Sequence, residues 1–209
     1  MYLHRHALAF IILSCLCASS PAWGEVTPRL NSDTIKAAFG SYGVEVIEQV
    51  ADTRVANLYS GHGDNKICRT LAVTEFTQPV DESLRSSHNK ILSGESIGAT
   101  LRAAGFAINK KLLVRTEVPA NETFVALAKG TATLGTPLFT KVYALFAETD
   151  QQTILYAVIA EAYHPAHFPP VHEEVTERSE LHQAAERALK KLAEYQIRSS
   201  LKNPSASQS

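Results

Sequence analysis

The segment RVANLYSGHGDNKICRT, residues 54–70, predicts two strands joined by a tight turn. Residues 54, 56, 58 and 60 alternate with residues 55, 57 and 59, with the period of two that is typical of a strand. Residues 61–65, Gly-His-Gly-Asp-Asn, are types that tolerate turn geometry. The alternation resumes over residues 66–76. We therefore expect a β-hairpin, and the rest of the chain is interpreted around it.

Each strand of this hairpin carries one arginine among apolar side chains, Arg54 and Arg69. Arginine is rarely fully buried unless it is paired. Two interpretations stay open at this point. The arginines form structural ion pairs or lie on an exposed strand edge, or they bind an anion.

A second hairpin is predicted from residues 138–147 and 153–163, joined by residues 148–152. The strand 153–163 is apolar on both faces, which is typical of a central strand that is covered on both sides. Glu161 is then a carboxylate in a hydrophobic strand. An isolated buried carboxylate is costly and tends to take up a proton, so Glu161 needs a partner, and the arginines are candidates.

The remaining pattern predicts an α+β fold, an antiparallel β-sheet with helices packed on one face, in a single domain over residues 25–203. Strands are also expected at 44–50 and 106–118, the latter interrupted at 109–111. Helices are expected at 34–39, 82–92, 96–104 and 121–129, and a long amphipathic helix over about 172–201. That last helix packs on the domain or forms a homodimer contact. Residues 204–209 are a disordered polar tail.

The N-terminus has the pattern of a secretory signal peptide, residues 1–24. A short basic start is followed by an apolar run over residues 7–16 and by small residues ahead of a cleavage point after Gly24. A lipoprotein signal at Cys15 is the alternative. Either pattern predicts a periplasmic or secreted protein, without an integral membrane segment after cleavage.

Composition excludes some classes of site. The formal net charge is −1, from 20 Lys and Arg against 21 Asp and Glu, and no basic stripe favours nucleic acid. After cleavage only Cys68 remains, so no internal disulfide can form. His164, His167 and His172 are close in sequence, but their spacing matches no metal-ligand pattern. We expect neither a metal nor a cofactor, and we interpret His88 as a core histidine.

The order of these features over residues 44–168 resembles the chorismate lyase family. Arg54 and Arg69-Thr70 match the two arginine strands of that family. The segment 94–98, Gly-Glu-Ser-Ile-Gly, is similar to its turn into a helix, and Glu161, four residues before Pro165, matches its active-site glutamate. The same layout resembles the UTRA ligand-binding domain of bacterial transcription factors, but no DNA-binding domain is expected here.

The resemblance implies a pocket for chorismate, which the family converts to 4-hydroxybenzoate and pyruvate. It implies that Arg54 and Arg69 bind carboxylates and that Glu161 contacts the ring hydroxyl and takes part in proton transfer. Ile97 and Leu101 would form a wall against the ring.

Three functions are compatible with the sequence. The first is a carbon–oxygen lyase that eliminates pyruvate from chorismate or a related enolpyruvyl acid, with Glu161, Arg54 and Arg69 as catalytic residues. The second is a non-catalytic periplasmic binding protein for a small aromatic carboxylic acid. The third is an envelope protein that uses the same pocket as a core or an interface. Arginines that bind an anion are expected for both of the first two functions, so the sequence does not separate them.

Overall fold

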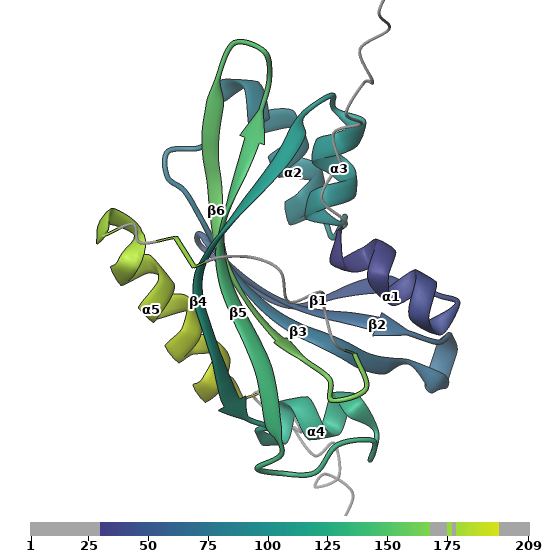
Figure 1. Ribbon diagram of the computed structural model, residues 1–209. Coiled ribbons are helices and arrows are strands. Elements are labelled where there is room, and N and C mark those ends of the chain that lie inside the picture. Colours follow the sequence, from purple (N-terminus) through teal and green to yellow (C-terminus); the bar gives the residue numbers. More distant parts are fainter. Residues whose placement is uncertain (1–29, 168–174, 177–178, 197–209) are drawn as a thin grey trace, which may run out of the picture.

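The computed structural model describes residues 30–167, 175–176 and 179–196, and it is an α+β fold with one antiparallel sheet (Figure 1). The strands are β1 (Gly43–Val50), β2 (Thr53–Ser60), β3 (Ile67–Phe76), β4 (Ala107–Pro119), β5 (Pro137–Glu148) and β6 (Thr153–Tyr163). The α-helices are α1 (Asn31–Phe39), α2 (Arg85–Leu92), α3 (Ile97–Ala103), α4 (Glu122–Ala128) and α5 (Ser179–Glu194). The predicted fold class is confirmed.

The sheet consists of two three-stranded halves joined in the middle. Its strand order is β1-β2-β3-β6-β5-β4, and all neighbours are antiparallel. Each half is built from strands that follow one another in the chain, and the pairing of β3 with β6 joins them. β6 is therefore a central strand, as its two apolar faces predict.

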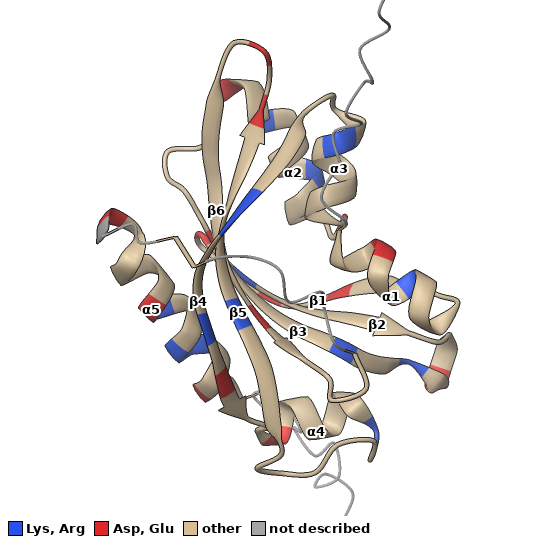
Figure 2. Cartoon of the chain, viewed as in Figure 1, with Lys and Arg blue, Asp and Glu red and all other residues tan. Residues whose placement is uncertain are grey.

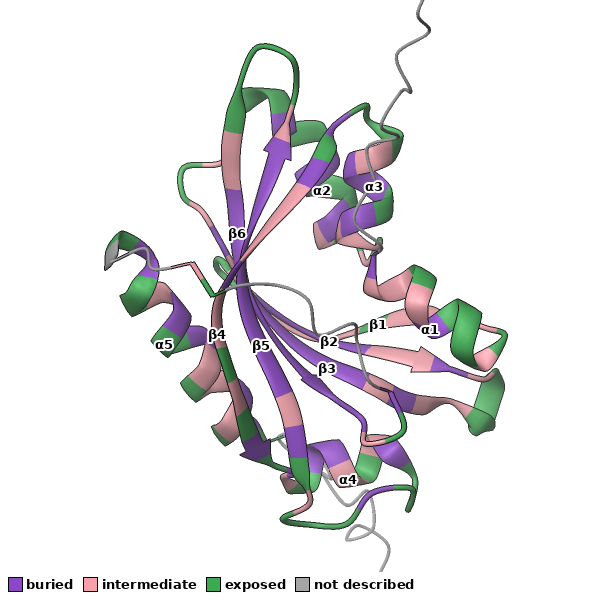
Figure 3. Cartoon of the chain, viewed as in Figure 1, coloured by how far each residue is buried: buried purple, intermediate pink, exposed green. Residues whose placement is uncertain are grey.

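The helices lie on both faces of the sheet, not on one face as expected from the sequence. Helices α4 and α5 contact the side where β3 and β6 contribute Val73, Val158 and Ala160. Helices α2 and α3 cover the side where β6 contributes Ala157 and Ile159. Because the central strands are apolar on both faces, each face needs a cover, and Figure 3 shows buried strands between helices whose outer sides are exposed.

Helix α5 forms the described part of the predicted C-terminal helix. Its buried residues face the sheet, and it contacts β3, β4, β5 and β6. These residues are Leu181, Ala185, Ala188 and Leu192. The interpretation that this helix packs on its own domain is confirmed for residues 179–194.

Two local expectations differ from the structure. Helix α1 begins at Asn31, and the side chain of Asp33 accepts a hydrogen bond from the backbone nitrogen of Leu30 at 3.3 Å. Strand β4 runs without a break through residues 109–111, because the backbone ladder to β5 does not depend on side-chain polarity. The irregularity in β4 is instead a bulge between Leu112 and Val114.

Several predictions lie outside the described residues. These are the signal peptide with its lipoprotein alternative, His172, and the polar tail. Within the described residues, no helix is both long and apolar enough to cross a membrane. Charged residues of both signs are interspersed over the elements drawn in Figure 2.

The core on the α5 side makes a testable contribution to stability. Leu71 on β3 is 1% exposed, so Leu71→Ala is expected to lower the free energy of unfolding by about 2–5 kcal/mol. Val50→Ala is the matched control, because Val50 is 58% exposed and should change stability by less than about 0.5 kcal/mol. Urea denaturation measures both, and equal losses in the two variants would contradict the described burial of β3.

Candidate functional site

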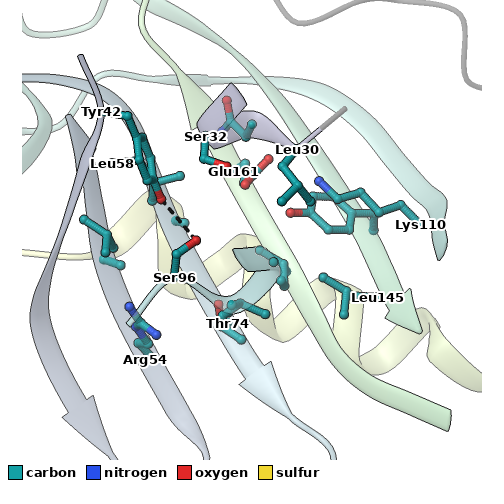
Figure 4. Close-up of a pocket in the computed structure, with 18 residues that line it drawn as sticks. Leu30, Ser32, Tyr42, Arg54, Leu58, Thr74, Ser96, Lys110, Leu145 and Glu161 are labelled. Atoms are coloured by element: carbon teal, nitrogen blue, oxygen red, sulfur yellow. Dashed lines mark hydrogen bonds between the residues drawn. The ribbon is translucent and has the colours of Figure 1, made fainter. Parts of the chain in front are cut away.

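A pocket lies on the face of the sheet that carries α1 and α3 (Figure 4). Its cavity volume is about 70 Å³, measured over the positions open to the centre of a water molecule. One water needs on the order of 10–15 Å³ in that measure, so the pocket has room for several. The lining combines many apolar side chains with a few polar ones: Leu30, Asn31, Ser32, Tyr42, Val44, Arg54, Ala56, Leu58, Ala72, Thr74, Ser96, Ile97, Gly98, Lys110, Tyr143, Leu145, Ile159 and Glu161.

Arg54 lines this pocket from β2 and is only 2% exposed. Its Nη1 donates to the carbonyl oxygen of Ile91 at 2.9 Å and to that of Glu95 at 3.0 Å. These carbonyls belong to the C-terminal end of α2 and the turn after it, where a helix leaves acceptors unsatisfied and favours a positive charge. Arg54 therefore fastens α2 to the sheet.

The other edge of the Arg54 guanidinium has no partner among the described residues. Its Nε is buried without an acceptor, and among the described residues Nη2 makes no hydrogen bond and no carboxylate oxygen lies within 4 Å. Burial lowers the pKa of Arg54, and the hydroxyls of Tyr42 and Tyr156 oppose that shift. Since arginine stays protonated in proteins, the pocket contains a buried cation with two adjacent donors available.

Glu161 lines the same pocket from β6 and is 4% exposed. The hydroxyl of Tyr163 donates to its Oε2. In the part of the chain that the structure describes, no nitrogen of Lys, Arg or His lies within 4 Å of the carboxylate. Arg54 and Glu161 thus share a pocket without pairing, and the structural ion pair that the sequence left open does not form.

Tyr42 and Ser96 add neutral hydroxyls to the pocket. The Tyr42 hydroxyl donates to Ser96 Oγ at 3.4 Å. Burial raises the pKa of Tyr42, and the Glu161 carboxylate raises it further, whereas the Ser96 hydrogen bond and Arg54 lower it. Tyr42 therefore stays a neutral hydroxyl in the pocket lining. The sequence analysis missed it, since a lone tyrosine before a strand has no distinguishing pattern.

Lys110 is a second cation in the lining that the sequence analysis missed. It extends from β4, is half-buried, and its Nζ lies 4.5 Å from the ring centroid of Tyr143, which also lines the pocket. An ammonium at this distance from an aromatic face is attracted to it. The expected strand interruption at 109–111 obscured the position of Lys110 on the pocket face.

Arg69 lies outside the pocket lining. Leu58 pairs with Thr70 and Tyr59 with Cys68, so Arg69 is the extra residue of a β-bulge, and it is not among the residues that line the pocket. Its Nε donates to Ser60 Oγ at 2.8 Å, and its guanidinium lies 3.7 Å from the ring centroid of Phe39. Its predicted part in ligand binding stays a prediction.

Of the two predicted wall residues, Ile97 lines the pocket and Leu101 does not. Leu101 is fully buried in the core between α3 and the sheet. The structure therefore brings Arg54, Ile97 and Glu161 together in one pocket.

Two glycines of the segment 94–98 allow α1 and α3 to pack closely beside the pocket. A Cβ added to Gly98 would lie 2.7 Å from both Cδ atoms of Leu30, so the absence of a side chain lets the start of α1 pack against α3. Gly94 has φ of +115°, which glycine adopts without the strain of a side chain. The turn thus places both Leu30 and Ile97 in the lining.

Two histidines after β6 tie this segment to the rest of the fold. His164 Nε2 lies 2.9 Å from Thr131 Oγ1, and its Nδ1 accepts from the backbone nitrogen of Ala166. His167 Nε2 lies 2.9 Å from Oδ1 of Asn31, a pocket residue. Residues 30–167, 175–176 and 179–196 contain no cluster of three potential metal ligands.

The fold and the pocket together define an α+β protein with a small, charged pocket. The chain matches no protein-family model and no curated protein sequence. Among solved structures it has a coarse similarity to the transcriptional regulator (GntR family) from Enterococcus faecalis V583. The TM-score is 0.34 and the sequence identity 14%, over 64% of this chain and 96% of that chain. A likeness this distant carries no argument about function, which must come from the site.

The buried histidines predict a stability that depends on pH. Burial is the largest cause that lowers the pKa of His88, His164 and His167 from the ordinary value of 6.5. Below that value the unfolded chain binds more protons than the folded one, so the free energy of unfolding should fall as the pH drops from about 6.5 to 5. Each histidine contributes at most about 1.4 kcal/mol per pH unit.

Chemical denaturation at several pH values measures this slope. His167→Gln should make it shallower, whereas His62→Gln, in an exposed turn, should leave it unchanged. A slope that is the same in His167→Gln and in the unaltered protein would contradict the assignment.

Proposed function

We propose that this protein binds a small aromatic or enolpyruvyl carboxylic acid in the pocket, with the ligand carboxylate on Arg54. The observation that carries the proposal is the unpaired Nε edge of a buried arginine in a largely apolar cavity. A buried charge is costly unless it is compensated, and no described carboxylate of the chain compensates Arg54. A carboxylate ligand would supply the missing charge.

The geometry suits a planar anion. Nε and Nη2 lie on one side of the guanidinium, the arrangement in which arginine binds a carboxylate through two parallel hydrogen bonds. The two carbonyls on Nη1 hold the guanidinium in a fixed orientation, so less conformational entropy is lost when the ligand binds. Ile97, Leu145 and Ile159 offer apolar contact to a ring or an enol side chain.

Glu161 would contact a donor group of the ligand, such as a ring hydroxyl. Tyr163 already donates to Oε2, which leaves Oε1 for the ligand. A carboxylate that accepts hydrogen bonds in a largely apolar pocket discriminates for a ligand with a matching donor, because an analogue without one leaves the carboxylate unsatisfied. 4-Hydroxybenzoate, which has an acid at one end and a hydroxyl at the other, is the simplest compound that meets both requirements.

A signal peptide over residues 1–24 would place this binding protein in the periplasm or outside the cell. A receptor or carrier for an exported or imported aromatic acid fits such a location. Binding requires no cofactor.

The second candidate is the chorismate-lyase-like elimination. The observation in its favour is the Glu161 carboxylate, which lies in the same pocket and has no ion-pair partner among the described residues. In that reaction the ring-carbon–ether-oxygen bond breaks and its electron pair leaves with the enolpyruvyl oxygen. The adjacent ring proton is lost, which makes the ring aromatic, and the enolpyruvate takes up a proton to become pyruvate. Glu161 would receive the ring proton.

Ligand-induced stabilisation tests the binding proposal. A ligand that binds only the folded state at 100 times its Kd adds about 2.7 kcal/mol, which for a domain of this size raises the Tm by about 5–10 °C. We expect 4-hydroxybenzoate to produce such a shift and Arg54→Lys to remove most of it, since an ammonium cannot form the paired hydrogen bonds. Thermal denaturation with and without ligand measures the shift for each variant.

Arg69→Gln is the control, because Arg69 does not line the pocket. It should keep the full ligand shift relative to its own ligand-free Tm. The reverse result, loss of the shift in Arg69→Gln and its retention in Arg54→Lys, would move the anion site away from the pocket and refute the proposal.

Turnover tests the second candidate. The purified protein is incubated with chorismate, and 4-hydroxybenzoate and pyruvate are quantified by chromatography. If the lyase reading is correct, both products form in equal amounts, and Glu161→Gln lowers the rate by roughly 10²–10⁴-fold, the usual contribution of a general base. No product above the spontaneous background would leave only the binding function.

A further inference from the structure

We propose that Lys110 is a specificity-determining residue that gives the pocket a second anion position. Carboxylic acids with a second anionic group directed toward β4 would then bind in preference to monoacids. This inference rests on the proposed function, since it presupposes that Arg54 holds the first carboxylate. Lys110 on β4 then has the role of second anion-binding cation, which the sequence had assigned to Arg69 on β3.

Lys110 and Arg54 approach the pocket on the same face of the sheet but from its two opposite halves. The strand order β1-β2-β3-β6-β5-β4 separates β2, which carries Arg54, from β4, which carries Lys110, by three strands. Neighbouring strands are about 4.8 Å apart, so the two backbones are roughly 19 Å apart across a flat sheet, and both long side chains extend inward over it. Figure 4 shows the two residues on opposite sides of the cavity.

The Lys110 side chain is held over the pocket and not extended into solvent. Its Nζ lies over the ring of Tyr143, whose own strand, β5, separates β4 from β6. Lysine commonly buries its stem while its ammonium stays at a polar boundary, and the half-buried state of Lys110 fits that behaviour. The aromatic face orients the ammonium without neutralising its charge.

No acidic side chain compensates Lys110 within the described residues. No ion pair joins it to Asp or Glu within 4 Å, and its one described contact of charge type is with Tyr143. The charged residues of the lining are therefore two cations on opposite sides, Arg54 and Lys110, and one carboxylate, Glu161. A ligand with two acids and a hydroxyl matches these three groups.

Lys111 provides a matched control on the neighbouring position of the same strand. It has the same intermediate exposure as Lys110, and its Nζ also lies over an aromatic ring, that of Phe146, at 5.5 Å. Successive side chains of a strand point to opposite faces, and Phe146 packs with Leu181 of α5 on the other face of the sheet. Lys111 thus has the same charge and setting but does not line the pocket.

The test compares two ligands of equal shape that differ by one charge. The probes are 3-(carboxymethoxy)benzoate, a diacid with an ether-linked second carboxylate, and its side-chain amide, 3-(carbamoylmethoxy)benzoate. Calorimetry measures the Kd of each for the unaltered protein, Lys110→Met and Lys111→Met. We expect the unaltered protein to bind the diacid about tenfold more tightly than the amide, a preference that weakens as salt is added.

In Lys110→Met this diacid preference should fall to about twofold or less, mainly because the diacid binds more weakly. Lys111→Met should keep the full preference. If the diacid is not preferred by the unaltered protein, or if both variants lose the preference equally, the assignment of Lys110 is overturned while the Arg54 site stands. If neither probe nor 4-hydroxybenzoate binds the unaltered protein, the proposed function fails and this inference fails with it.

Discussion

The pairing of β3 with β6 is the constraint on which the rest of this structure depends. It joins two locally formed three-stranded units into one sheet, and it places the two most apolar strands at the centre. Because these strands are apolar on both faces, helices must cover both faces: α4 and α5 on one, and α1, α2 and α3 on the other. On the second face, α1 and α3 leave the pocket between them and the sheet.

The pocket keeps two opposite charges buried and apart. An ion pair between Arg54 and Glu161 would compensate both, but Arg54 is held by the carbonyls after α2 and Glu161 by the hydroxyl of Tyr163. Each group is thus oriented by a neutral partner, and Arg54 keeps a buried Nε without an acceptor among the described residues. Buried charges arranged in this way lower the stability of the empty protein and favour a ligand that completes them. In a structural salt bridge the two charges would instead compensate each other and leave nothing for a ligand to complete.

Helix α1 connects this pocket with the segment after β6. Residues at its start form part of the lining. Leu30 packs against Gly98 of α3, and Asn31 forms a hydrogen bond with His167. Asn31 also donates to Thr70 on β3 at 3.1 Å. The position of one pocket wall therefore depends on groups from α3, β3 and the loop after β6, which are far apart in the sequence.

The sequence by itself determined the elements, the antiparallel α+β class and the two buried charges that matter, because alternation, turn residues and a carboxylate in an apolar strand are local signals. Tertiary structure decided which side chains meet. Arg69 contacts Ser60 and Phe39 outside the pocket lining, and Leu101 is buried in the core while Ile97 lines the cavity. Lys110 and Tyr42 enter the site only through strand order and the path of the chain before β1. Register, bulges and strand order are set by long-range pairing, which no local pattern records.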